Sequence, residues 1–269
     1  TLGSALVTRT ARPTHKQEKG GQLSQLAKAI KSEKFVVTSE LNPPKGTDLG
    51  SLYERADMLK GSVDAFNITD SHAAKMSIAP MAVAHLLIDR GIEPIMQMTS
   101  RDKNRIALQG DLLGAAVLGV SNVVFMGGDP PEIGDHPGAT GVFDLMSNEL
   151  IGAASGLCHG QDLSGRHLSG VPDLYLGAVV NPGASDLNAE IDKMKNKIDA
   201  GAQFLQSQAI YDPASFEKFM NAIEGINVSI LAGIILLKSA KMARYMTENV
   251  PGIDVPDPLI QEMEDAEDK

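Results

Sequence analysis

Short apolar runs alternate with longer amphipathic segments along most of the chain. The stretch from Ile95 to Pro131 shows the pattern most clearly, because it predicts a strand, a helix and then the strand Asn122–Met126 (NVVFM). This last run is mostly apolar without alternation, which is typical of a parallel strand covered on both faces. The helix before it is predicted to begin at an N-cap, Asp102, and to end at Gly119. Its sheet-facing side is predicted to carry Ile106, Gly110, Leu113 and Val117.

The same pattern predicts seven strands, with helices between them. The strands are expected at 35–41, 64–70, 93–99, 122–126, 174–180, 203–210 and 228–233. The other helices are expected at 23–30, 48–60, 77–90, 185–200, from 212 onward and at 238–248.

The spacing of the strands indicates a barrel. The first four expected strands begin at Phe35, Asp64, Glu93 and Asn122, each 29 residues after the one before. A solenoid could share this period, but the leucine-rich pattern is absent and each unit contains a helix long enough for a crossover. The next interval is 52 residues, so about 23 extra residues lie within 130–172. We interpret 130–172 as an insertion at the barrel rim.

The expected fold is therefore a single α/β domain over residues 1–269, a (β/α)8 TIM-type barrel. After Gly233 only 36 residues remain, and no eighth βα unit is evident. We therefore expect the sequence to stop short of the complete barrel, leaving two open strand edges that would favour association with another chain. Residues 1–21 lack periodicity and are expected to form a flexible N-terminal arm.

Composition argues against several classes of protein. The net charge is −10 and no basic run is present, which argues against a nucleic-acid surface. The single cysteine, Cys158, excludes an internal disulfide, and the first 20 residues lack the apolar stretch of a signal peptide. No apolar run reaches the roughly 18 residues that a membrane span requires. These features predict a cytoplasmic protein without a membrane span.

Candidate catalytic residues follow the predicted strands, where parallel barrels carry their active-site loops. Glu40 ends the first strand, Asp129 follows the fourth in the run GGDPP, and Gln208 lies near the end of the sixth. Each has a simpler interpretation. Glu40 could be a solvated surface acid, Asp129 an Asx-turn residue, and Gln208 a hydrogen-bonded glutamine of the barrel interior.

Two other groups of polar residues are candidate sites, and each has a simpler interpretation. Lys197, together with Lys193 and Lys195, has the spacing of a solvated helix face. A cluster of three residues in the insertion could suggest zinc, although a structural zinc site takes four ligands, and we expect no metal. The cluster consists of Cys158, His159 and His167. No GxGxxG motif is present, which counts against a Rossmann site.

Several motifs in the same order resemble the methylenetetrahydrofolate reductase family. They are SELNPPKG, TSRDKNRIALQGDLLGAAVLGVSNVVFMGGDPP and KIDAGAQFLQSQAIYD, and the resemblance runs from about Phe35 to Pro256. It implies a (β/α)8 barrel that holds FAD at its C-terminal face and reduces 5,10-methylenetetrahydrofolate to 5-methyltetrahydrofolate by hydride transfer. GDHPGATGVFDL and LAGIILLKSAKMARYM further resemble the bacterial branch found in one-carbon and acetyl-forming pathways.

The resemblance also implies roles for individual residues. Glu40 matches the family's general acid, Asp129 the acid beside flavin and folate, and Gln208 a folate-contacting glutamine. The matching flavin-contact positions are Thr69, Gln97, Asn181 and Lys197. Gln97 and Asn181 replace residue types common in better-known members of the family.

The resemblance leaves the electron donor open. It is either NADH or NADPH, or a second subunit that contains a metal centre. With one cysteine, the chain cannot hold an iron–sulfur cluster with four thiolates of its own.

Two other functions fit the same barrel. One is a Schiff-base aldolase with Lys238 or Lys75 as the reactive amine. The other is a non-catalytic docking subunit of a one-carbon enzyme complex, against which Glu40, Asp129 and Gln208 together argue.

Overall fold

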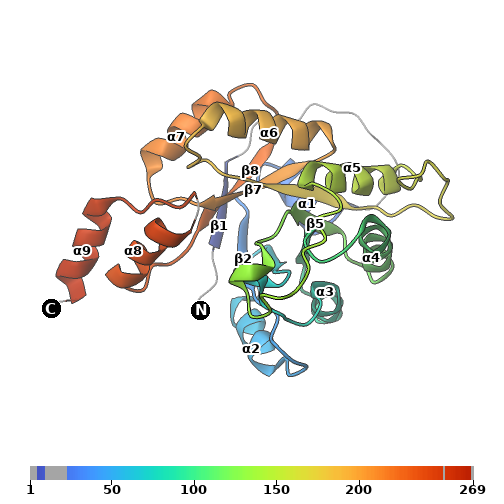
Figure 1. Ribbon diagram of the computed structural model, residues 1–269, viewed down its shortest axis with the longest axis horizontal. Helices are drawn as coiled ribbons and strands as arrows, with labels where there is room; N and C mark the ends of the chain where they lie inside the picture. Colours follow the sequence, from blue (N-terminus) through green and yellow to red (C-terminus); the bar gives the residue numbers. More distant parts are fainter. Residues whose placement is uncertain (1–4, 10–22, 251, 268–269) are drawn as a thin grey trace.

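A closed barrel of eight strands forms the centre of the computed structural model, which describes residues 5–9, 23–250 and 252–267 (Figure 1). Neighbours in the barrel follow the order of the sequence from β1 to β8. The strands are β1 (Ala5–Arg9), β2 (Val37–Leu41), β3 (Ala65–Ile68), β4 (Pro94–Thr99), β5 (Asn122–Met126), β6 (Tyr175–Val180), β7 (Phe204–Ala209) and β8 (Ser229–Ile234). β2 to β8 are parallel, and their carboxyl ends therefore meet at one rim.

The strand β1 corrects the expected strand count. It lies within the segment interpreted as a flexible arm and pairs antiparallel with both β2 and β8. The expectation of two open edges is therefore wrong, because backbone hydrogen bonds continue around the ring. No eighth βα unit is present in the described ranges, and β1 stands where its parallel strand would lie. The rest of the arm, 1–4 and 10–21, lies outside the described residues.

Helices lie around the barrel, across one end of it and to one side of it (Figure 1). They are α1 (Gln25–Lys31), α2 (Gly50–Leu59), α3 (Pro80–Asp89), α4 (Arg105–Val117), α5 (Ser147–Cys158), α6 (Leu187–Asp199), α7 (Pro213–Ala222), α8 (Ala240–Asn249) and α9 (Asp257–Glu267), with the short 3₁₀ turns η1 (His72–Ala74) and η2 (Pro131–Ile133). No helix of the described residues is both long and apolar enough to cross a membrane.

The helix α1 closes the amino-terminal end of the barrel. Its buried Leu26, Ala27 and Ile30 belong to the same cluster as side chains of the barrel interior. Polar contacts fix it there: the Ser24 hydroxyl donates to Asn122 Oδ1 over 2.6 Å, and the Leu26 N–H donates to Glu93 Oε1 over 3.1 Å. Access to the barrel interior is therefore left to the opposite rim.

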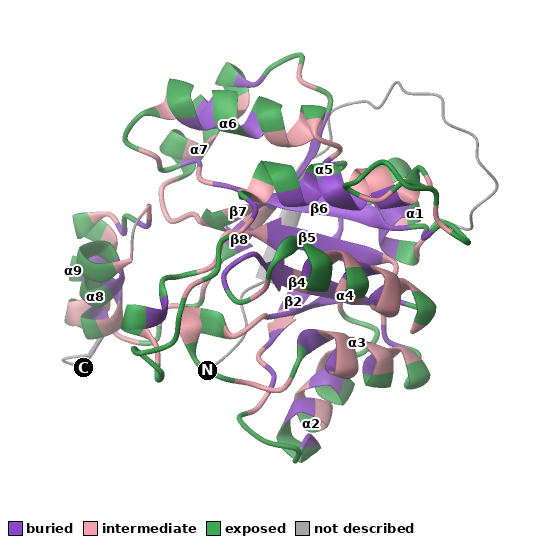
Figure 2. Ribbon diagram, turned by 45° about the vertical axis from the view of Figure 1, so that its right-hand side comes forward, coloured by how far each residue is buried: buried purple, intermediate pink, exposed green. Residues whose placement is uncertain are grey.

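Alternation along the strands separates an inner core from an outer one. Ile95, Val124 and Leu231 pack inside the barrel, whereas Met96, Val123 and Ile230 pack outward among the helices. Figure 2 shows the central strands as almost continuously buried. This two-sided burial explains why the strands read as apolar runs in the sequence.

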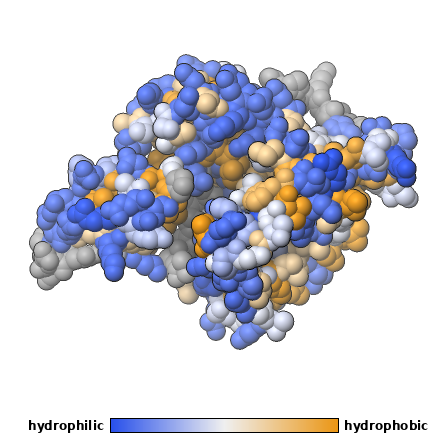
Figure 3. All heavy atoms as spheres, in the orientation of Figure 1, coloured by the Kyte–Doolittle hydropathy of each residue, from blue (hydrophilic) through white to orange (hydrophobic). Residues whose placement is uncertain are grey.

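The orientation of α4 differs from the expectation. Asn104, rather than Asp102, is the N-cap, and its Oδ1 accepts hydrogen bonds from the backbone N–H groups of Ile106 and Ala107. The buried face carries Leu108, Leu112 and Ala115, while Ile106 is 77% exposed and Val117 is 87% exposed. The expected face was wrong because α4 is apolar on two sides, so periodicity alone did not select one. Figure 3 shows hydrophobic side chains exposed in this region.

The segment 130–172 contains a regular barrel helix as well as extra chain. α5 lies between β5 and β6 and packs on both strands. The additional residues form the loops on either side of it, and the first loop carries η2, which contacts η1. This first loop therefore lies at the rim where the parallel strands end.

Two helices continue beyond the last parallel strand. α8 begins at Ala240 after the N-cap Ser239, and the acidic C-terminal segment forms α9. The two helices share a small core of their own, which includes Ala243, Met246 and Ile260. Figure 1 shows both of them to one side of the barrel.

Candidate active site

The inner face of the barrel changes from apolar to polar toward the carboxyl ends of the strands. Asn67 Nδ2 donates to the Thr38 hydroxyl over 3.2 Å, and Gln206 Nε2 donates to Asn67 Oδ1 over 2.5 Å, which links β2, β3 and β7 across the interior. Residues two positions further along a strand face the same way. Glu40 on β2 therefore faces the barrel mouth directly above Thr38.

Glu40 is partly buried at the end of β2, level with Asn67 on β3. Burial raises the pKa of its carboxyl group, and the nearby charge of His72 acts in the opposite direction. Desolvation is the larger effect, because a carboxylate removed from water loses more than one imidazolium restores. The site thus favours the protonated, proton-donating form of Glu40.

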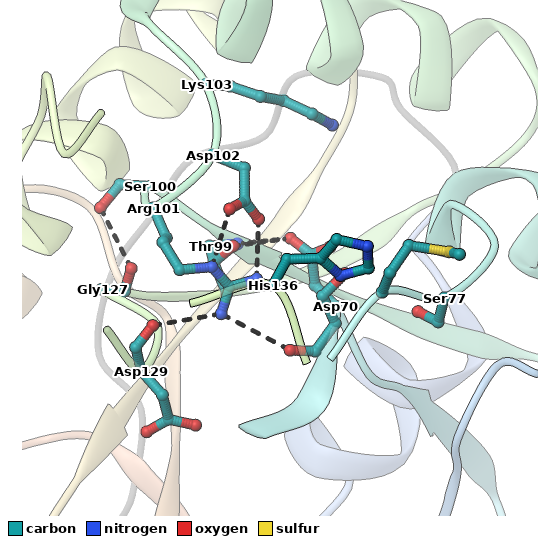
Figure 4. Close-up of polar contacts among 12 residues, drawn as sticks. Asp70, Ser77, Thr99, Ser100, Arg101, Asp102, Lys103, Gly127, Asp129 and His136 are labelled. Carbon is teal, nitrogen blue, oxygen red and sulfur yellow. Dashed lines mark hydrogen bonds and ion pairs between the residues drawn. The ribbon is translucent and has the colours of Figure 1, made fainter. Parts of the chain in front are cut away.

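Asp129 lies in the loop after β5, as expected, and its side chain is exposed. The preceding Gly128 has φ of +90°, and a Cβ atom there would lie 3.0 Å from Thr99 Cβ. Glycine is therefore required on both conformational and steric grounds. Figure 4 shows the Asp129 carboxylate directed away from Arg101, while the backbone carbonyl of Asp129 accepts a hydrogen bond from Arg101 Nη1 over 3.3 Å.

A buried network behind Asp129 fixes the loops after β3, β4 and β5 (Figure 4). Arg101 is only 3% exposed and forms a two-pronged ion pair with Asp102, at 2.8 and 2.7 Å. Its Nη1 also donates to the carbonyl oxygen of Ser71 over 3.5 Å. Asp70 accepts hydrogen bonds from both the backbone N–H and the hydroxyl of Thr99, each over 2.9 Å. Burial nevertheless raises the pKa of Asp70.

Gln208 lies in an irregular part of β7. The pairing of β7 with β8 shifts between Gln206 and Ala209, so the chain bulges there and the Gln208 side chain is exposed. Gly233 on β8 accommodates the bulge, because a Cβ atom there would lie 2.6 Å from the carbonyl oxygen of Ser207. The bulge leaves the Gln208 amide free of the barrel packing, unlike that of Gln206, which is buried.

The four expected flavin contacts lie on two parts of the rim, at the ends of β3 and β4 and near the end of β6. Gln97 on β4 is half-buried, two residues beyond the inward-facing Ile95. Thr69 is buried after β3, and its hydroxyl donates to Asn42 Oδ1 over 2.9 Å.

The other two expected contacts bond to backbone groups near the end of β6. Asn181 Oδ1 accepts from the Gly183 N–H over 3.0 Å. Lys197 Nζ donates to the Val179 carbonyl over 2.6 Å, and burial lowers the pKa of its ammonium group.

Residues 134–136 of the insertion, called the strap below, cross the loops after β2 and β3. Asp135 Oδ2 accepts from Lys45 Nζ over 2.6 Å, and Asp135 Oδ1 accepts from the Met76 N–H over 3.0 Å. These bonds, together with His136, hold the pKa of the Asp135 carboxyl well below its usual range. A Cβ atom on Gly134 would lie 1.9 Å from the carbonyl oxygen of Ala74, so the strap rests directly on η1. The strap thus fixes one side of the mouth.

The described part of the chain contains no group of three or more His, Cys, Asp or Glu side chains placed to hold a metal ion. A cavity of about 270 Å³ lies at the amino-terminal end of the barrel, lined in part by Lys60, Asp64 and Glu93. It contains none of the expected site residues, and the candidate active site is therefore the opposite rim.

Three residues at this rim were not predicted as site residues: Asp70, His72 and Arg101. The TSRDKNR motif contained Arg101, but nothing in the local sequence distinguishes a buried arginine from a surface one. His72 follows β3 by four residues, and its position after a strand was the one signal available.

Comparisons with known proteins bear on this barrel. The family model "Methylenetetrahydrofolate reductase" matches residues 25–269. "Methylenetetrahydrofolate reductase (NADH) 1" of Zea mays is 25% identical over 238 residues, which cover 84% of this chain and 39% of the maize protein. "5,10-methylenetetrahydrofolate reductase" of Pectobacterium carotovorum is 24% identical over 212 residues, 76% of this chain and 65% of that protein. The chain thus spans well under half the length of the maize relative.

A solved structure supports the fold. An uncharacterized protein from Clostridium thermocellum, described as binding two copies of 5-methyl-5,6,7,8-tetrahydrofolic acid, superposes with a TM-score of 0.55 at 16% identity, covering 85% of this chain and 75% of that one. Since the family model matches nearly the whole length of the sequence, the chain belongs to the methylenetetrahydrofolate reductase family.

Proposed function

We propose that this chain reduces 5,10-methylenetetrahydrofolate to 5-methyltetrahydrofolate with FAD as the bound cofactor. The observation that carries the proposal is Glu40: an acid facing the barrel mouth, with a pKa raised by burial, at the position that matches the family's general acid. Family membership supports the reaction class. The reduced folate bound by the structural neighbour from Clostridium supports a folate as the ligand of such a barrel.

Glu40 would act first, as a general acid. Opening the five-membered ring of the substrate requires a proton on the departing amine nitrogen, and the resulting methylene iminium carries a positive charge. A partly desolvated carboxylic acid is suited to this task, because burial raises its pKa and so favours the form that carries the proton. Glu40 becomes a carboxylate in this step and must regain a proton before the next turnover.

Asp129 would stabilise the charge that develops after ring opening. Its backbone is held at the rim by Gly128 and by the contact of Arg101 with its carbonyl group. A negative charge placed near the methylene iminium lowers the energy of that cation. Gln208, exposed in the bulge of β7, would bind the folate through its side-chain amide.

The residues at the rim fit FAD in part. Gln97 and Thr69 come from the ends of neighbouring strands. The half-buried Gln97 would offer its amide to the polar edge of a flavin ring, whereas the Thr69 hydroxyl is buried and bonded to Asn42. Asn181 and Lys197 would contribute from the β6 side, although each bonds to a backbone group there. When bound, FAD would supply the hydride that the methylene carbon receives.

We further propose that electrons reach the flavin from a separate donor, either NADH or NADPH or a metal-containing partner subunit. The first alternative is supported by the name of the maize relative, which specifies NADH. The second rests on the resemblance of GDHPGATGVFDL and LLKSAKMARYM to the bacterial branch. Rapid, saturable bleaching of bound flavin by NADH in the isolated chain would favour the first and contradict the second.

The aldolase alternative receives no support from the lysines it requires. Lys75 and Lys238 are both exposed, whereas a Schiff-base lysine is activated by desolvation or by a neighbouring cation. The docking-subunit alternative predicts that the isolated chain turns nothing over.

The absorption spectrum of the purified protein is the first test. We expect bound flavin, and reduction of methylenetetrahydrofolate with an artificial electron donor. A colourless protein that cannot be reconstituted with FAD would overturn the flavin proposal, and a flavin-loaded protein without folate turnover would favour the docking subunit.

A further inference from the structure

His72 is placed beside Glu40 by the topology of the barrel. β2 and β3 are adjacent, and Glu40 is level with Asn67. Beyond the strands, the two segments that follow β2 and β3 remain hydrogen-bonded to each other. The Thr69 N–H donates to the Leu41 carbonyl over 3.3 Å, and the Thr69 hydroxyl donates to Asn42. The chain then turns through η1, which begins at His72. His72 is thus an imidazole on the loop next to the candidate acid.

The turn that carries His72 is strained. Ser71, Ala73 and Ala74 have φ angles of +46°, +54° and +53°, a left-handed conformation that costs energy for any residue with a side chain. No glycine relieves the turn. Such backbone persists only where surrounding contacts impose it, and clusters of it occur at functional sites.

Contacts from two other loops impose this conformation. Arg101 Nη1 donates to the Ser71 carbonyl, and Asp135 accepts from the Met76 N–H, so the turn is held at both ends. Gly134 lies against the Ala74 carbonyl, with no room for a side chain. The strap and the buried arginine therefore set where His72 lies.

Glu40 and His72 differ in their access to water. Glu40 is partly buried at the mouth, whereas His72 is exposed. Because a bound folate and flavin would cover the mouth, the acid would have no direct route to solvent protons. An exposed imidazole on the neighbouring loop supplies one, because histidine exchanges protons near neutral pH.

Four of the other charged groups at this rim have partners of their own. Asp70 is bonded to Thr99, and Arg101 is paired with Asp102. Lys45 and His136 both bind Asp135, and Asp129 projects from the loop after β5. Of the described charged residues, His72 is the one whose charge acts on Glu40.

We propose that His72 is a positioning residue for the proton of Glu40: its imidazolium returns a proton to the Glu40 carboxylate after each turnover and is itself reprotonated by water. The inference rests on the proposed function, in which Glu40 gives one proton to the amine nitrogen of the folate. The exchange balances, since the N–H bond of the imidazolium breaks as the O–H bond of the carboxylic acid forms.

The first test does not require turnover. In the purified protein, the titration of the Glu40 carboxyl group is followed by carbon-13 NMR in the wild type and in His72→Gln, with His159→Gln as a matched control that removes an exposed histidine elsewhere. We expect His72→Gln to raise the pH at which Glu40 titrates, because the charge that lowers the pKa of Glu40 is gone. An unchanged titration would show that the two groups do not interact and would overturn the proposal.

The second test uses the flavin-loaded protein. We expect His72→Gln to reduce folate turnover about 10²-fold, to move the alkaline limb of the pH profile upward, and to be rescued by added imidazole. His159→Gln should behave as the wild type. If the wild type turns over and His72→Gln matches it at every pH, or if imidazole restores nothing, the His72 proposal fails while the proposed function stands. If the wild type itself does not reduce the folate, the proposed function fails.

Discussion

Replacing Arg101 by methionine should show how much of the active-site rim depends on one buried guanidinium. Methionine keeps most of the apolar stem and removes the hydrogen-bonding fork. The Asp102 partner is 45% exposed, so loss of that ion pair should cost about 0–1 kcal/mol. The bonds to the Ser71 and Asp129 carbonyls are long, at 3.5 and 3.3 Å, and should contribute about 0.5–1.5 kcal/mol each.

The sum, about 1–4 kcal/mol in the free energy of unfolding, should lower Tm by roughly 2–8 °C for a chain of this size. Urea unfolding followed by far-ultraviolet circular dichroism measures it directly. Arg105→Met is the matched control, because Arg105 binds Asp144 through two similar contacts of 2.9 Å but its side chain is 53% exposed. Its loss should cost less than that of Arg101, because solvent screens an exposed ion pair. If Arg101→Met is as stable as Arg105→Met, Arg101 does not hold the three loops together.

Three further variants test individual carboxylates. Glu40→Gln should retain flavin and lose folate reduction, because the amide keeps the shape and cannot donate the proton; turnover at the wild-type rate would remove Glu40 from the mechanism. Asp129→Asn should slow folate reduction about 10²-fold, roughly 3 kcal/mol in the barrier, and an unchanged rate in stopped-flow assays would make Asp129 a turn residue. Asp70→Asn should become more stable relative to the wild type as pH rises. Burial raises the pKa of Asp70, so in the wild type this group contributes stability that is fully present below its unfolded-state pKa, about 3.9. That contribution is lost as pH rises through its folded-state pKa. Urea midpoints that differ equally at pH 4 and pH 8 would contradict the last expectation.

The sequence was sufficient for the parallel strands but not for the strand that closes the ring. Asn122–Met126 was predicted with the bounds it has in the structure, because a strand buried on both faces is an apolar run bounded by turn residues. Ala5–Arg9 lies in a stretch without periodicity that carries several threonines and glycines, and its pairing with β2 and β8 is non-local. The sequence predicts the position of α4 along the chain correctly but not the face that it buries, because two faces of this helix are apolar.

The candidate site likewise contains residues that the sequence could predict and residues that it could not. Glu40 and Asp129 could be found because parallel strands deliver their end residues to one rim. Arg101 and Asp70 could not, because their roles depend on partners such as Ser71 and Thr99 that only the fold brings near. The resemblance suggested Lys197 as a flavin contact, but it could not show that its ammonium group bonds to the Val179 carbonyl.

The most direct test of the central claim is a single-turnover experiment without oxygen. The flavin-loaded protein is reduced, freed of reductant and mixed with 5,10-methylenetetrahydrofolate, while flavin absorbance and folate products are followed. We predict that the flavin is reoxidised as an equal amount of 5-methyltetrahydrofolate forms, and that Glu40→Gln abolishes both changes without releasing the flavin. A flavin that stays reduced in the wild type in the presence of the folate would contradict the account.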